Sequence, residues 1–338
     1  MGLINRLKKL FFSSKKADKF PDLPEKQFRN EVTRTQVNFS WPKENQILFK
    51  QLEDKYYQYF IGVNSLLKLD LNTFEIEVIK SLENTIEYNN SLADDIPRLP
   101  DIIPKLIHLF RNDDFTWQEA AYLISQDPVL LVGIIKVANS SRYNLQVKDE
   151  ELENILMQLG LLEVRKVMMK VALKPILLVE GGHFLKHSGT KIWIHSVKTA
   201  EACHTLAKLY QYDPFDAYLA GLIHNLGMAI VVQKMNAIKE FKNVPRSILF
   251  KEKLLNLSKL LSVKIAYNWE IDPDIVHALE EQMQEDAIDI QSPLGKMLYE
   301  ATAVSMKYVL VGEHRWGDNE SYDIDSENNT FVIAYNNL

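Results

Sequence analysis

The residue whose type and surroundings first suggest chemistry is His224, in the segment AGLIHNLG. The chain before and after it carries apolar residues at helical spacing, which form one stripe: Phe215, Tyr218, Leu219, Leu222, Ile223 and Leu226. His224 lies off this stripe, on a face with Ala217, Ala220 and Gly221, whose small side chains let a second helix approach closely. We therefore expect one buried helix that brings the polar pair His224-Asn225 to a packed interface. The imidazole is either a core side chain satisfied by a neighbour or part of a functional site.

Other candidates for chemistry are less informative. His183 and His187 are spaced i, i+4, so both could bind one metal ion, but the flanking Gly181-Gly182 and Ser188-Gly189 favour an exposed loop. No Ser-His-Asp arrangement can be inferred, because the serines of ANSS lie in a helical context without a strand-to-helix nucleophile turn.

The elements that must position these residues are predicted to be helices. Four helix starts share one device, an Asp or Ser cap followed by proline: Asp127-Pro128, Asp213-Pro214, Asp272-Pro273 and Ser292-Pro293. Thr116 and Glu119 form a fifth start, a capping box. The helix after Asp127 is apolar nearly all round, which predicts burial in the middle of a bundle. The fold class is therefore all-α.

The chain divides into four predicted parts. Residues 1–43 form a basic tail and linker, 44–90 a helical region with its break near 69–72, 91–312 the main helical domain, and 313–338 an acidic tail whose segment TFVIAY has strand-like residues. Residues 1–19 are either a solvated tail or a weak contact with an anionic membrane surface. Four aromatic residues of the helical region are interpreted as packing residues: Tyr56, Tyr57, Tyr59 and Phe60.

Composition excludes several classes of protein. Hydrophobic residues make up 46% and charged residues 25%, as in a globular protein. The sequence contains no run of about 18 apolar residues, so no membrane-spanning helix is predicted. A net charge of -6 argues against a dedicated nucleic-acid binder. Cys203, the only cysteine, can form neither an internal disulfide nor a Cys-based zinc site. Glycine-rich phosphate-binding loops are missing. We expect a reducing, cytoplasmic setting.

Three stretches of the sequence resemble the bacterial HDOD domains, a regulatory branch of the HD phosphohydrolase superfamily. The first is IPRLPDIIPKLIHLF, and the second is WQEAAYLISQDPVLLVGIIKVANSSRYN, with its LISQDP and ANSS. The third pairs WIHSVKTAEACHTLAKLY with DPFDAYLAGLIHNLG, similar to the two histidine-bearing helices of the superfamily. The resemblance covers roughly residues 92–310 and implies an HD-type helical domain preceded by a short helical region.

The resemblance places the metal site of the superfamily on a few residues. The first ligand falls on His195 and the His-Asp doublet on His224-Asn225, so an amide replaces the carboxylate. Asn offers one neutral carbonyl oxygen and cannot bridge two ions as Asp can. The later histidines fall near Glu281 and Gln282, with His277 displaced by about a helical turn. The closing aspartate falls within LYEATAVS, which contains Glu300 and Thr302 but no Asp, so Glu300 is a possible ligand.

The resemblance favours a non-catalytic bacterial signalling protein with a degenerate HD-type site, which acts through a protein partner or a small ligand. No catalytic residue, metal, cofactor or nucleic-acid partner is then expected. The rival hypothesis is a phosphohydrolase of nucleotides or cyclic dinucleotides, with a divalent metal between His195, His224 and either Glu300 or His277. A third possibility is a helical adaptor that shares only the fold.

Overall fold

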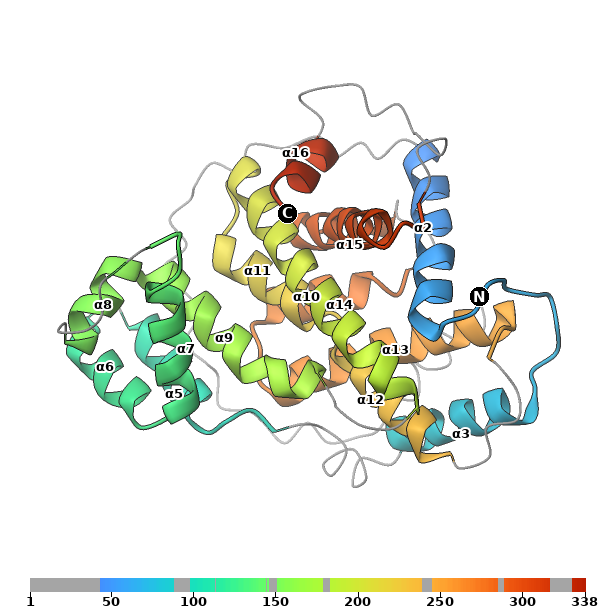
Figure 1. Ribbon diagram of the computed structural model, residues 1–338, viewed down its shortest axis with the longest axis horizontal. Coiled ribbons are helices and arrows are strands. Elements are labelled where there is room, and N and C mark those ends of the chain that lie inside the picture. The colour runs from blue at the N-terminus through green and yellow to red at the C-terminus, as the bar shows by residue number, and fades with distance from the viewer. Residues whose placement is uncertain are drawn as a thin grey trace. The chain divides into compact units, whose positions relative to one another are not determined.

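The computed structural model describes residues 43–87, 98–112, 114–143, 145, 151–178, 183–238, 245–284, 289–316 and 330–338. All of these residues belong to the second of two units, which spans Phe39–Leu338. They form helices and no strand, and an isolated β-bridge joins Leu67 to Ser247 (Figure 1). The predicted all-α class is confirmed. The predicted tail at residues 1–19 lies outside the described residues.

The described residues form a series of helices along the chain. They are α2 (Lys43–Ile61), α3 (Thr73–Glu87), α5 (Ile102–Arg111), α6 (Trp117–Ser125), α7 (Pro128–Ala138), α8 (Leu152–Leu159), α9 (Leu161–Leu177), α10 (His183–Leu209), α11 (Pro214–Ile223), α12 (Leu226–Ala237), α13 (Ile248–Asn268), α14 (Pro273–Glu281), α15 (Pro293–Gly312) and α16 (Thr330–Asn336). The predicted helical region ahead of the main domain is present as α2 and α3.

The predicted helix starts are confirmed. Asp127, Asp213, Asp272 and Ser292 each cap a helix, since each accepts hydrogen bonds from backbone N–H groups of the first turn and precedes a proline. The capping box is also complete, with the Thr116 hydroxyl accepting from Glu119 N and the Glu119 carboxylate accepting from Thr116 N. Local sequence is sufficient to predict these helix starts, because a capping side chain forms its hydrogen bonds within the first turn of the same helix.

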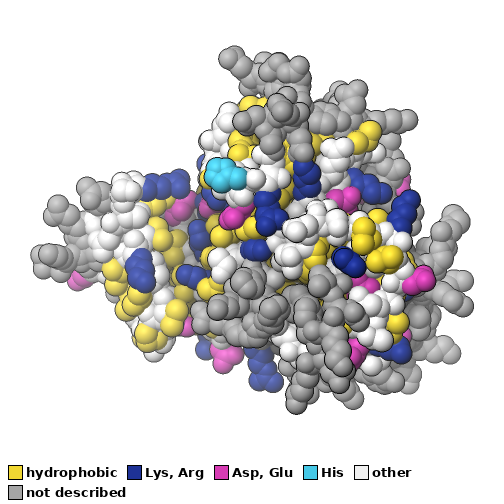
Figure 2. Space-filling view, turned by 45° about the vertical axis from the view of Figure 1, so that its right-hand side comes forward, with side chains coloured by type: hydrophobic (Ala, Val, Ile, Leu, Met, Phe, Trp, Pro, Cys, Tyr) yellow, Lys and Arg dark blue, Asp and Glu magenta, His cyan; other side chains and the backbone are white. Residues whose placement is uncertain are grey.

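The prediction for α7 is wrong. Leu130, Ile134 and Ala138 are buried, but Val129 is 67% and Val132 49% exposed. The helix packs against α6 and α9 on one side only. It belongs with α5, α6 and α8 to the group at the left of Figure 1, and Figure 2 shows apolar side chains at the surface of that part. Apolarity all round therefore did not decide burial, because burial depends on which neighbours exist.

The central helix is α10, which contacts α11, α12 and α15 and also α2, α9 and α16. In Figure 1 it lies between α11 and α2. Its closest neighbour is α11, because Gly221 faces its backbone: a Cβ atom at Gly221 would lie 2.7 Å from Ala200 Cα and 2.8 Å from Thr199 C. The close approach expected from the small residues before His224 is confirmed.

Two other local predictions need correction. The helix expected to run through AGLIHNLG is interrupted, since α11 ends at Ile223, His224 is its C-cap residue and Asn225 precedes α12. The segment that begins at His183 is helical from that residue on and is not a loop. The helix break matters because it turns the side chains of the polar pair away from a simple helical register.

The end of the predicted acidic tail is also structured. Residues Thr330–Asn336 form α16, a helix and not a strand, which packs against α10 and α15. Ala334 is fully buried, the rings of Tyr308 and Tyr335 lie 5.7 Å apart, and the Thr330 hydroxyl donates to Glu300 Oε1. The β-branched and aromatic residues of TFVIAY follow their tertiary contacts here and not their strand propensity.

By length and composition, one part of the described chain could cross a membrane, and a second could do so only if a bent pair of helices is counted as one span. One is Pro214–Ala237, with a mean hydropathy of 1.5, and the other is the pair formed by α6 and α7, bent by 120°. Within the first, 78% of the most apolar window is buried against the rest of the protein. The run-length criterion had missed this segment, whose burial is typical of a core helix.

We predict that Gly221→Ala lowers the free energy of unfolding by about 1–3 kcal/mol, because the new methyl group overlaps the backbone of α10. Gly312→Ala is the control, since a Cβ atom there meets nothing within 4 Å. Urea denaturation followed by circular dichroism measures both variants. Equal midpoints for the two would contradict the close helix contact.

Candidate functional site

The two histidines singled out from the sequence lie together in the structure. His195 is on α10 and His224 at the end of α11, and their ring centroids are 5.1 Å apart with an interplanar angle of 70°. His195 is only 2% exposed. The expectation that these side chains lie within reach of each other on neighbouring helices is confirmed.

The hydrogen bonds of the pair assign different tautomers to the two rings. The side-chain amide of Asn225 lies with Nδ2 2.8 Å from His195 Nδ1, so this ring nitrogen accepts and the proton of a neutral His195 is on Nε2. His224 Nδ1 lies 2.6 Å from the Gly221 carbonyl oxygen, so it donates and the lone pair of His224 is on Nε2. Neither Nε2 atom has a hydrogen-bond partner among the described residues.

Burial keeps both imidazoles neutral. Desolvation, followed by the repulsion from His224, holds the pKa of His195 well below its ordinary value. Desolvation also lowers the pKa of His224 to about 4, although its bond to the Gly221 carbonyl acts in the opposite direction. The pair is therefore uncharged at neutral pH and carries no positive charge into the interior.

Tyr56 is the site residue that the sequence interpretation missed. Tyr57, Tyr59 and Phe60 are buried packing residues, as expected. Tyr56 instead lies over the ring of His195, with centroids 4.5 Å apart, and its hydroxyl donates to the Lys191 carbonyl oxygen at 3.2 Å. No sequence signal distinguished it from its aromatic neighbours, because its partner is distant in sequence.

A cavity of about 870 Å³ adjoins the pair. Its walls come from α2, α10, the end of α11, α12, α13, α14 and α15, and His195, His224 and Asn225 belong to its lining. Thr302 of α15 also lines it, with its hydroxyl donating to the Leu298 carbonyl oxygen at 2.7 Å. In the LYEATAVS segment it is thus Thr302, and not Glu300, that lies beside the histidines.

Glu300 and His277 lie away from the pair. Glu300 is buried on another side of α15, where Oε1 accepts from Thr330 of α16. The side chain of His277 is 60% exposed on α14, 3.7 Å from both Glu280 and Glu281. Neither residue lines the cavity. The structure therefore does not bring the two possible additional ligands to the site.

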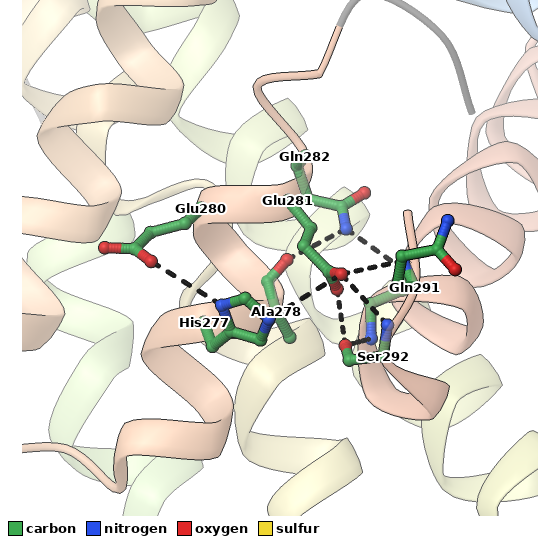
Figure 3. Close-up of polar contacts among 8 residues, drawn as sticks. His277, Ala278, Glu280, Glu281, Gln282, Gln291 and Ser292 are labelled. Carbon is green, nitrogen blue, oxygen red and sulfur yellow. Dashed lines mark hydrogen bonds and ion pairs between the residues drawn. The ribbon is translucent and has the colours of Figure 1, made fainter. Parts of the chain in front are cut away.

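Glu281, on which the resemblance places a ligand position, has a structural role (Figure 3). It is 4% exposed, and its Oε1 accepts from Gln291 N at 2.7 Å and Ser292 N at 2.9 Å. Its Oε2 accepts from the Ser292 hydroxyl. The neighbouring Gln282 donates to the carbonyl oxygens of Ala278 and Gly295. These bonds tie the end of α14 to the start of α15.

The donor set beside the cavity does not fit a divalent metal. His195 accepts through Nδ1 and carries its proton on Nε2, so only His224 Nε2 offers a lone pair. Asn225 directs an N–H group at His195, and in the described residues no three His, Cys, Asp or Glu side chains gather into a possible metal-binding group. A single neutral ligand leaves the charge of a metal ion uncompensated.

Comparison with known proteins gives one family. The model of the HDOD domain matches residues 96–285. An uncharacterized protein of Treponema pallidum (strain Nichols) is 24% identical over 165 residues, which are 46% of this chain and 31% of that protein. The match therefore spans about a third of the length of this curated relative.

Three solved structures share the fold. An HDOD domain protein of unknown function from Geobacter sulfurreducens has a TM-score of 0.51 at 18% identity, covering 78% of this chain and 88% of its own. Two proteins of Shewanella amazonensis SB2B carry the provisional names metal-dependent phosphohydrolase and phosphohydrolase. Both are 20% identical, with TM-scores of 0.54 and 0.53, and they cover 79% and 76% of this chain and 98% and 93% of their own. At these identities the likeness shows the fold alone.

We predict that Glu281→Ala lowers the free energy of unfolding by about 2–4 kcal/mol, because it removes the acceptor of three hydrogen bonds in a buried place. The control is Glu280→Ala, at the more exposed preceding position, which should change the free energy of unfolding by less than about 0.5 kcal/mol. Thermal or urea unfolding compares the two. A loss of equal size in both variants would show that Glu281 does not hold the junction.

The neutral histidines make stability depend on pH. The pKa of His224 is about 4 in the folded chain and about 6.5 when unfolded, so unfolding takes up a proton and stability is lost as pH falls below about 6.5. We expect His224 to account for a loss on the order of 2 kcal/mol between pH 7 and pH 5. His224→Asn keeps a donor near the Gly221 carbonyl and should reduce the loss by that amount. An unchanged pH dependence of the urea midpoint would contradict this.

Proposed function

This chain belongs to the HDOD domain family, and from this membership we propose that it is a non-catalytic regulatory protein whose HD-type site has lost its metal ligands. The proposed role is in bacterial signalling, inside the cytoplasm. The domain would act through a small ligand or a protein partner.

The observation that carries this proposal is the hydrogen bond from Asn225 Nδ2 to His195 Nδ1 at 2.8 Å. Metal-dependent phosphohydrolysis needs ligands that hold the ion and lower the pKa of its bound water. The amide brings no negative charge, and it consumes the acceptor nitrogen of the other histidine. In this arrangement the side chain that would complete a metal site occupies Nδ1 of its neighbour and brings no carboxylate.

The surroundings of the remaining positions support the same conclusion. Glu281 and Gln282 are engaged in the junction between α14 and α15, and Glu300 is engaged with Thr330 of α16. His277 is exposed on α14, away from the cavity. A single substitution at Asn225 would therefore not restore a ligand set.

The partners in this proposal do not include nucleic acid. The chain has a net charge of -6, and on the face shown in Figure 2 Lys and Arg side chains are interspersed with Asp and Glu. Stable binding to the phosphate backbone of a nucleic acid needs a surface on which basic residues are clustered. Weak contact of residues 1–19 with an anionic membrane stays a prediction.

We predict that the purified full chain holds less than about 0.1 equivalent of Mn, Fe, Zn or Mg, because the donor set offers one lone pair. Elemental analysis after gel filtration in metal-supplemented buffer measures this. His195→Ala and His224→Ala are compared with His277→Ala as the exposed control. One metal per chain, lost in the first two variants and kept in the third, would establish the rival phosphohydrolase.

We also predict that Asn225→Asp gains no phosphatase or phosphodiesterase activity, because the other ligand positions stay engaged elsewhere. The assay uses a generic aryl phosphate, an aryl phosphodiester and a cyclic dinucleotide, each with Mn²⁺ and with Mg²⁺. The wild-type chain is the control for background hydrolysis. Metal-dependent turnover in the variant would show that a further ligand exists near His195.

A further inference from the structure

The cavity beside the histidine pair is partly built by a helix outside the matched family segment. Residues 96–285 match the HDOD model, whereas α2 spans Lys43–Ile61 and contributes Phe49, Glu53 and Tyr56 to the lining. A volume of about 870 Å³ is in the range of small-molecule binding sites. The helix α2 therefore supplies one wall of a partly open site.

The charges of the lining argue against a highly charged ligand. Lys50, Lys251 and Lys259 face Glu53 and Glu252, so the two signs nearly balance. The buried Lys251 already pairs with Glu53 at 3.2 Å and with Asp54, and Lys259 lies 4.0 Å from Glu53. A polyanion would have to take these lysines from their carboxylates. The balance favours a neutral ligand.

Neutral polar groups are plentiful in the same lining. Asn225, Asn256 and Gln282 contribute amides, which carry donors and acceptors side by side. Gln282 uses its N–H groups on the Ala278 and Gly295 carbonyl oxygens, so its own carbonyl oxygen is what it can offer a ligand. Three lining residues also bury a polar atom without a partner among the described residues: Tyr57 through its hydroxyl, and His195 and His224 through Nε2. Such groups call for a polar ligand or water.

Flat aromatic surfaces complete the lining. Phe49 of α2 and Tyr299 of α15 stack on each other, with centroids 4.1 Å apart and an interplanar angle of 14°. Tyr56, also in the lining, lies over the ring of His195 with centroids 4.5 Å apart. Aromatic side chains bind planar rings by stacking, so a heterocycle would extend the Phe49–Tyr299 stack or displace one of its rings.

We propose that this cavity binds a neutral, planar heterocycle with donors and acceptors on its edge, of the nucleobase type, and that it takes the nucleoside in preference to the nucleotide. The proposal rests on the proposed loss of the metal site, since a bound metal ion would give the cavity a strong group for a phosphate, whereas Lys251 and Lys259 already lie against carboxylates. Aromatic rings would contact the faces of the base, and amides its edge.

Binding of defined probes to the full chain tests the proposal. Isothermal titration calorimetry is carried out with adenosine, guanosine, cytidine and uridine and with their 5′-monophosphates, in a buffer near physiological salt. We expect at least one nucleoside to bind in the micromolar range, and its monophosphate to bind at least about tenfold more weakly. Absence of binding by all four nucleosides, or tighter binding of a monophosphate, overturns the proposal.

Two substitutions on α13 locate the binding. Asn256→Trp places an indole at the cavity wall and should abolish nucleoside binding, whereas Asn154→Trp on exposed α8, outside the lining, should leave it unchanged. Glu252→Gln removes one lining carboxylate and should strengthen monophosphate binding about threefold or more. Melting curves check that each variant is folded. Binding that survives Asn256→Trp lies elsewhere and overturns the assignment.

The ligand proposal and the proposed function can be refuted separately. Nucleoside binding is read without turnover, and the metal content is read without a nucleoside. A metal-free chain that binds no nucleoside refutes the ligand class alone. A chain with a metal ion that depends on His195 refutes the proposed function, whatever its ligand.

Discussion

The close contact between α10 and α11 at Gly221 is the constraint on which the site depends. With no side chain at this position, the backbone at Thr199 and Ala200 can come near enough for His195 and His224 to meet. The helix break after Ile223 then turns Asn225 back toward His195. One small residue thus sets the separation of the helices, and the separation sets which polar atoms find each other.

Features that are satisfied within one turn of chain could be predicted from the sequence. The Asp and Ser caps, the capping box at Thr116 and the small residues beside His224 all act through near neighbours or through simple lack of bulk. Features that depend on a distant partner could not. Val129 is exposed because no described helix covers that side of α7. The segment TFVIAY is helical and packs against α10 and α15.

The candidate site was predictable to the same extent. Helical spacing drew attention to His224 and the adjacent Asn225, and the resemblance to the HDOD domains added His195. Tyr56 was assigned to packing, since nothing in its neighbourhood refers to a ring on α10. Glu300 and Thr302 differ by about half a helical turn, and only the rotation of α15 decides that Thr302 lines the cavity and Glu300 meets α16. Rotation of a buried helix is set by all its neighbours together.

The packing of α10 has a consequence for cooperativity. Three of its neighbours, α2, α15 and α16, lie outside the matched residues 96–285, yet Tyr57, Leu298 and Ala334 of these helices are buried. A fragment cut at the family boundaries would expose the apolar faces that these helices cover, and it would lose the Ser292 end of the bonds to Glu281. We therefore expect the segment that unfolds cooperatively to be longer than the segment that similarity recognises, and to extend from α2 to α16.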